Sequence, residues 1–113
     1  MAVQVANLFV PVVLTTSAAN IYVAPATPTS LIVARIRVRF SNTSNASVSV
    51  TAYAIPTGGT ALASNECLPG VAIAANAYLD VDIPVLAPGG AFAAMATAAT
   101  SITVAQLDGV IFS

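Results

Sequence analysis

The chain has 113 residues and a formal net charge of −1, and 6% of its residues are charged whereas 58% are apolar. A soluble domain usually carries about 25% charged residues, so much of this exterior must be uncharged or covered by other subunits. The chain contains no lysine and no histidine, which excludes a basic nucleic-acid-binding surface and every catalytic triad that depends on histidine.

The first half of the chain begins with an apolar stretch of irregular alternation. Residues 1–14 are expected to form an N-terminal strand or arm, which Pro11 confines to the edge of a sheet. Residues 15–113 are expected to form a single domain with one core. Its first strand is predicted over Asn20–Ala24 and ends at Pro25, because proline removes a hydrogen-bond donor and restricts the residue before it.

The clearest strand is predicted over Leu31–Phe40. Its residues alternate strictly, and alternate residues of a strand point to opposite faces of the sheet. One face would carry apolar side chains and the other a row of arginines: Ala34, Ile36, Val38 and Phe40 against Arg35, Arg37 and Arg39. A turn rich in serine and asparagine then leads to a half-buried strand over Ser47–Ile55.

The second half of the chain contains more turn residues. Pro56 to Gly59 predicts a turn, and Ser64–Gly70 is expected to be a loop. Tyr78–Ile83 alternates as a strand whose polar face is acidic, with Asp80 and Asp82. Another tight turn follows in the sequence APGGAF. The last predicted strands are Ala91–Thr97, Ile102–Leu107 and Val110–Phe112, with Asp108-Gly109 as a hairpin signal between the last two.

These elements predict an all-β fold. Seven or eight short strands separated by turns are typical of a single antiparallel β-sandwich, here expected to resemble a jelly roll. Proline and glycine recur too often for a long amphipathic helix. The uncharged tract 85–105 is interrupted by Pro88, Gly89 and Gly90, so we expect no membrane-spanning segment. The single Cys67 cannot form an internal disulfide, and the N-terminus lacks the positive charge of a signal peptide, which favours an intracellular origin.

The order of short motifs along residues 15–113 resembles small bacteriophage virion proteins, namely capsid decoration (cement) proteins and related tail-associated β-sandwich modules. The motifs that carry the resemblance are Ile21-Tyr22-Val23-Ala24-Pro25, Ser41-Asn42-Thr43-Ser44, Ile55-Pro56-Thr57-Gly58-Gly59, Leu86-Ala87-Pro88-Gly89 and Leu107-Asp108-Gly109-Val110. Each motif by itself is a turn sequence of a kind that many β-sandwich proteins contain. The resemblance therefore depends on the order of the motifs along the chain.

This resemblance implies a structural role without catalysis. The leading hypothesis is a capsid decoration protein, expected to be a homotrimer, that binds and stabilises the assembled lattice of the major capsid protein. Such a protein would be made in the host cytoplasm and would lie on the capsid surface, with no cofactor, no nucleic acid and no membrane as partner. The alternative from the same resemblance is a structural or adhesive module of a tail or fibre, which would use exposed aromatic residues for adhesion.

The polar residues offer few candidates for chemistry. Asp80 and Asp82 share a strand face about 7 Å apart, a spacing that is compatible with paired catalytic carboxylates or with part of a calcium site. Both interpretations need further groups from other elements, and we expect neither an enzyme nor a metal site. A solvated or ion-paired strand face is the preferred interpretation of the two aspartates.

The row of Arg35, Arg37 and Arg39 is the most informative polar feature, because like charges on one strand face repel unless opposite charges balance them. One hypothesis pairs the row with Asp80 and Asp82, on the same sheet or on a neighbouring subunit. Another places it against an acidic patch of the major capsid protein, and a third leaves it hydrated. These five residues are therefore the candidate subunit-contact residues.

Overall fold

The computed structural model describes residues 3–5, 7–25 and 32–112; the side chains of residues 3–5, 32–35 and 112 lie outside the description. The described residues form a short 3-10 helix, Ala63–Asn65, and nine strands: β1 Val3–Val5, β2 Val12–Val13, β3 Ala19–Val23, β4 Ile32–Asn42, β5 Val48–Ile55, β6 Glu66–Ile73, β7 Tyr78–Ile83, β8 Ala91–Ala96 and β9 Ile102–Phe112. No helix in this part of the chain is long and apolar enough to cross a membrane.

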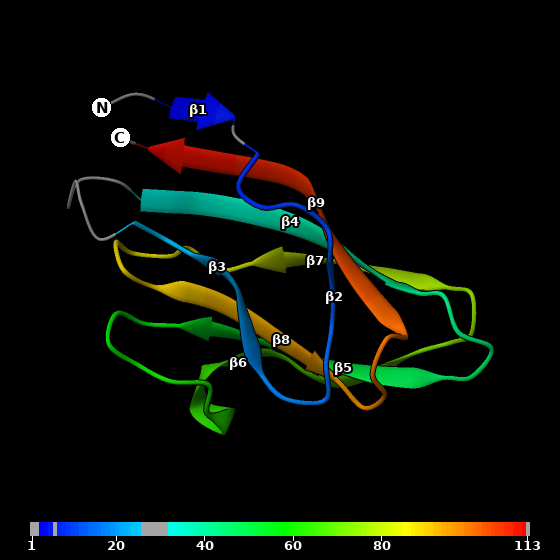
Figure 1. The fold of residues 1–113 in the computed structure, drawn as a ribbon. Coiled ribbons are helices and arrows are strands. Elements are labelled where there is room, and N and C mark those ends of the chain that lie inside the picture. The colour runs from blue at the N-terminus through cyan, green and yellow to red at the C-terminus, as the bar shows by residue number, and fades with distance from the viewer. Residues whose placement is uncertain (1–2, 6, 26–31, 113) are drawn as a thin grey trace.

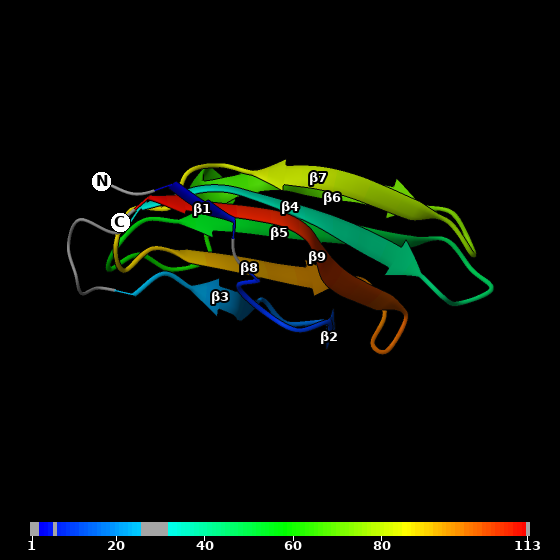
Figure 2. The same cartoon turned by 90° about the horizontal axis from the view of Figure 1, so that it is seen from above.

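The strands form two antiparallel sheets, which lie as two layers one above the other (Figures 1 and 2). Sheet A has the order β1-β9-β4-β7, with β2 also paired to β9, and sheet B has the order β3-β8-β5-β6. If β1 and β2 are counted as one interrupted first strand and the later strands are renumbered from 2 to 8, sheet A has the order 1-8-3-6 and sheet B the order 2-7-4-5. This is the strand order of a jelly roll, and the predicted β-sandwich is therefore confirmed.

The core lies between the two sheets and is built by alternation. Ile36, Val38 and Phe40 of β4 are fully buried, as the period of two predicted, and Val48, Val50 and Ala52 of β5 face them from sheet B. Phe92 of β8 lies at the centre, with the ring of Phe40 at 6.5 Å and that of Phe9 at 6.1 Å. Phe9 belongs to the segment between β1 and β2, so the N-terminal residues contribute to the core as well as to the edge of sheet A.

Two glycine turns at one end of the sandwich pack against each other, and both were expected from the sequence. The amide of Gly59 donates to the Pro56 carbonyl and that of Gly90 to the Ala87 carbonyl, each at 2.9 Å. Gly58 and Gly89 have φ angles of +77° and +82°, a region that L side chains rarely adopt. The hydroxyl of Thr57 donates to the Pro88 carbonyl at 2.6 Å and joins the two turns.

The prediction of a loop over Ser64–Gly70 is wrong, because residues from Glu66 onward belong to strand β6. Pro69 and Gly70 caused the error, since both residues usually interrupt strands. The register with β5 steps from Val50↔Val71 to Ala52↔Leu68. Pro69 and Gly70 therefore lie in a β-bulge. A proline is tolerated there because β6 is the edge strand of sheet B and because the bulge needs no backbone N–H donor at the position of Pro69.

The prediction of a hairpin at Asp108-Gly109 is also wrong. Strand β9 runs without a turn from Ile102 to Phe112, because both of its halves pair with the long strand β4. The register steps from Arg37↔Asp108 to Val38↔Gln106 and leaves Leu107 as the extra residue of a bulge. Without this extra residue, the alternation of β9 would turn Asp108 toward the core. The bulge keeps the carboxylate on the outer face, opposite an arginine.

Asn42 at the end of β4 is a buried polar residue with a complete set of partners. Its side-chain amide donates to the carbonyls of Ala46 and Ile73 at 2.8 and 2.9 Å. Its side-chain oxygen accepts from the backbone amide and from the hydroxyl of Ser44 at 3.0 and 2.7 Å. A buried amide is tolerated only when it is paired in this way, so Asn42 determines the shape of the turn that the serine- and asparagine-rich sequence predicted.

Replacing Asn42 by alanine should destabilise the fold by roughly 1–3 kcal/mol, because the backbone groups that it binds lose their buried partners. Asn45 in the same turn is exposed, and Asn45→Ala is the matched control, expected to stay within about 0.5 kcal/mol of the wild type. Urea unfolding followed by circular dichroism measures both variants. Equal unfolding midpoints for the two variants would show that Asn42 does not organise the turn.

Candidate functional site

The candidate residues lie on the outer face of sheet A, where β4 runs between β9 and β7. Arg37 is directly opposite Asp82 and Arg39 is directly opposite Asp80 in the β4–β7 ladder. The backbone of Arg35 pairs with Val110 of β9, and its side chain lies outside the described residues. The hypothesis that the arginine row meets the two aspartates on the same sheet is therefore confirmed for Arg37 and Arg39. We call the outer side formed by Arg37, Arg39, Asp80, Asp82 and Asp108 the charged face.

Arg39 and Asp80 form the tightest contact of the charged face. The Nε and Nη2 groups of Arg39 donate to the two oxygens of the Asp80 carboxylate at 2.8 and 3.0 Å. The guanidinium also lies 4.0 Å from the ring centre of Tyr78, in a cation–π contact. The hydrogen bonds from Arg39 lower the pKa of Asp80, and the same hydrogen bonds raise the pKa of Arg39. Both groups therefore stay charged near neutral pH.

Arg37 and Asp82 are held more loosely. The closest approach between the Arg37 Nε and a carboxylate oxygen of Asp82 is 3.8 Å, beyond hydrogen-bond distance. Their side chains are 55% and 68% exposed, whereas those of Arg39 and Asp80 are 39% and 22% exposed. Asp108 is opposite Arg37 on the other neighbouring strand. Arg37 therefore lies between two acidic strand positions without a tight bond to Asp82.

The charged residues of the chain are unevenly distributed between the two sheets. Three arginines and three aspartates occupy strands of sheet A, at positions 35, 37, 39, 80, 82 and 108, and their formal charges cancel. The four strands of sheet B contain one charged residue, Glu66. Sequence reasoning missed Asp108 as a member of the charged face because it assigned this residue to a turn. It also missed Tyr78 as a partner of Arg39, although the two-residue spacing of Tyr78 and Asp80 places both on one face.

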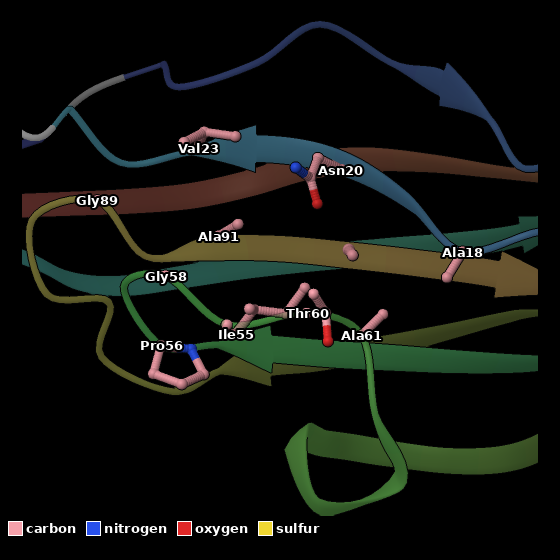
Figure 3. A pocket seen from close by; sticks show the side chains of 12 residues that line it. Ala18, Asn20, Val23, Ile55, Pro56, Gly58, Thr60, Ala61, Gly89 and Ala91 are labelled. Atoms are coloured by element: carbon pink, nitrogen blue, oxygen red, sulfur yellow. The ribbon is translucent and has the colours of Figure 1, made fainter.

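The outer face of sheet B carries a shallow pocket of about 310 Å³. Ala91 of β8 lies at its floor, Asn20 and Val23 of β3 lie on one side, and the segment from Pro56 to Ala61 lies on the other (Figure 3). Ala93 of β8 also lines it. The twelve residues that line it include no charged and no aromatic side chain. The pocket therefore offers no group for acid–base chemistry and no ring on which a sugar could stack.

The tyrosines and the cysteine do not form a second site. Tyr53 is buried against sheet B with its hydroxyl 3.7 Å from the sulfur of Met95, Tyr22 lies in β3, and Tyr78 is exposed on the charged face. Burial raises the pKa of the half-buried Cys67 thiol, which disfavours a reactive thiolate. Within the described residues, no group of three or more metal-ligating side chains is found.

The chain was compared with protein-family models, with curated proteins and with solved structures, and no match was found in any of the three.

Acid should destabilise the fold through Asp80. Because the folded-state pKa of Asp80 lies below its unfolded value of about 3.9, its stabilising contact is fully present above that value and is lost as the pH falls through the folded pKa. We expect the urea midpoint of the wild type to fall progressively as the pH drops below about 5. Asp80→Asn and Arg39→Gln should be less stable near neutral pH and should lose less on acidification. Parallel declines in all three proteins would contradict the assignment.

Proposed function

We propose that the chain is a structural subunit of a bacteriophage virion, a capsid decoration (cement) protein that binds and stabilises the assembled lattice of the major capsid protein. The observation that carries this proposal is the distribution of charge. Six of the seven charged residues lie on strands of sheet A, where their formal charges cancel. The seventh, Glu66, is the one charged residue on the strands of sheet B. The family resemblance of the sequence motifs agrees with a virion role.

An uncharged surface of this kind is suited to being covered. A free soluble domain usually intersperses charges of both signs over its exterior. Here, several large apolar side chains are exposed outside the charged face: Val10, Val13, Val23, Leu62 and Val85. Exposed apolar groups among uncharged neighbours are typical of contact surfaces between proteins. Packing against other subunits would remove these side chains from water.

The sheet edges favour the proposal of assembly through the faces of the sheets over assembly through added strands. An open edge strand invites pairing with another chain unless it is short, bulged, charged or interrupted by proline. Strand β6 has the bulge at Pro69, β3 has a register shift and is followed by Pro25, and β7 carries Asp80 and Asp82 and ends before Pro84. The opposite edge of sheet A is divided between β1 and β2, which have three and two residues.

Binding of this kind stabilises a shell by mass action. A subunit that binds the assembled lattice but not its separated components shifts the equilibrium toward the lattice by its binding free energy. No turnover, cofactor or nucleic acid takes part, and the partners are copies of the same chain, proposed as a trimer, and the major capsid protein. Jelly rolls also occur in viral capsid proteins and in lectins, which supports the proposal by analogy of fold alone.

The test is to locate the protein in virions of the phage that encodes it. Intact particles, separated heads and separated tails are compared by quantitative mass spectrometry. Many copies on heads, together with heads that break at lower temperature when the protein is removed, are the expected result. A few copies on tails would replace the proposal with a tail or fibre module, and absence from particles would overturn both.

Arg37→Glu tests the involvement of the charged face in the same particles. Because this substitution places three acidic residues around one strand position, we expect lower occupancy on heads. Glu66→Gln, which removes a charge from sheet B, is the control for a general effect of altered charge. Unchanged occupancy of Arg37→Glu would exclude the charged face from the contact with the shell.

A further inference from the structure

The difference between the two ion pairs of the charged face indicates which pair can bind another molecule. Arg39 and Asp80 already satisfy each other through two hydrogen bonds, with Tyr78 stacked on the guanidinium. Arg37 and Asp82 lie 3.8 Å apart and are more than half exposed. Two exposed and loosely paired groups of opposite sign can each form a shorter contact with a partner at little loss to the fold.

We propose that Arg37 and Asp82 of one copy bind Asp82 and Arg37 of a second copy, with the charged faces of the two copies packed against each other around a twofold axis. This inference rests on the proposed assembly role and names the partner of the charged face. The partner is a second copy because the face is complementary to itself: a positive column on β4 lies beside an acidic column on β7, in direct register.

The geometry of the ladder determines the orientation of the axis. An axis that lies between the two faces, parallel to the strands and midway between β4 and β7, places β4 of each copy over β7 of the other. Arg37 then faces Asp82 of the partner subunit, because residues directly opposite in a ladder have the same position along the strand. An axis perpendicular to the strands would instead place arginine over arginine. One twofold arrangement therefore matches opposite charges, as an isologous contact requires.

Two other positions agree with this arrangement. Tyr78 is opposite Ser41 in the same ladder, so the axis places the strand position of Tyr78 over that of Ser41 of the partner subunit. Residue Tyr78 is 60% exposed in the single chain, and burial of aromatic side chains is a common source of affinity between proteins. Asp108 lies on β9, on the far side of β4 from β7, and the rotation carries it beyond the outer edge of β7, away from like charge.

The size of the molecule is sufficient for such a contact. The two longer dimensions of the molecule are 45 and 26 Å, and each partner in a standard protein interface contributes about 800 Å². The acidic edge strand β7 also disfavours the competing side-by-side association of two sheets, because Asp80 and Asp82 of two copies would then lie next to each other. In a shell of trimers, a twofold contact would connect subunits of neighbouring trimers.

The test uses two charge reversals, Arg37→Glu and Asp82→Arg, in the full chain. Each variant alone should weaken the twofold contact, because the two contacts across the axis become like-charged; the dissociation constant of this contact, measured by analytical ultracentrifugation, should rise by at least about tenfold. An equimolar mixture should recover self-association close to that of the wild type, because positions 37 and 82 of the unlike chains again have opposite charges. The pair within each chain remains like-charged in the mixture, so recovery reports the contact between chains.

Glu66→Arg is the matched control, since it changes the net charge as Asp82→Arg does but lies on sheet B. It should leave the dissociation constant unchanged, and circular dichroism should show that every variant is folded. A mixture that associates no better than the single variants would overturn the inference, as would a wild-type chain that stays monomeric or associates only as far as a trimer. The virion location is measured separately, so the loss of this contact would leave the proposed function standing if the protein is found on heads.

Discussion

The alternation of strand β4 is the constraint on which the rest of the molecule depends. This strand lies inside sheet A with neighbours on both sides, so every second residue must enter the core and those between must leave it. Ile36, Val38 and Phe40 are fully buried and pack against sheet B. Arg37 and Arg39 are their immediate sequence neighbours and therefore lie outside, where the adjacent strands must carry acids to balance them. One strand thus determines both the core and the charged face.

Other features of the fold serve the same balance of charge. The bulge at Leu107 resets the alternation of β9 and keeps Asp108 on the outer side. Strand β7 carries Asp80 and Asp82 at the two positions that oppose Arg39 and Arg37. Because the ion pairs are grouped on one sheet, sheet B is left with uncharged residues apart from Glu66. In the proposed assembly, contacts made through sheet B would therefore remove few charges from water.

Much of the fold was predictable because its signals are local. The alternation in β4, β5 and β7 and the glycine turns at 56–59 and 87–90 can be recognised without knowing the neighbouring strands. Strand β6 was missed because Pro69 and Gly70 are local breakers that an edge bulge tolerates. The turn at Asp108-Gly109 was predicted because local chemistry favours it, whereas pairing with an 11-residue partner strand extends β9 through it. The pairing of Arg37 and Arg39 with Asp82 and Asp80 depends on which strands are neighbours, which a strand pattern alone does not determine.

The pairing of the first strand with the last has a practical consequence. Val3 is opposite Phe112 in the β1–β9 ladder, and Figure 1 shows β1 beside the last part of β9. Cα atoms of directly paired residues are about 5 Å apart, so a short linker would join residues 3 and 112 without disturbing either sheet. The chain could then be cut open at the exposed turn around Gly58, giving a circular permutant with the same strand order and with new ends at a different corner of the molecule.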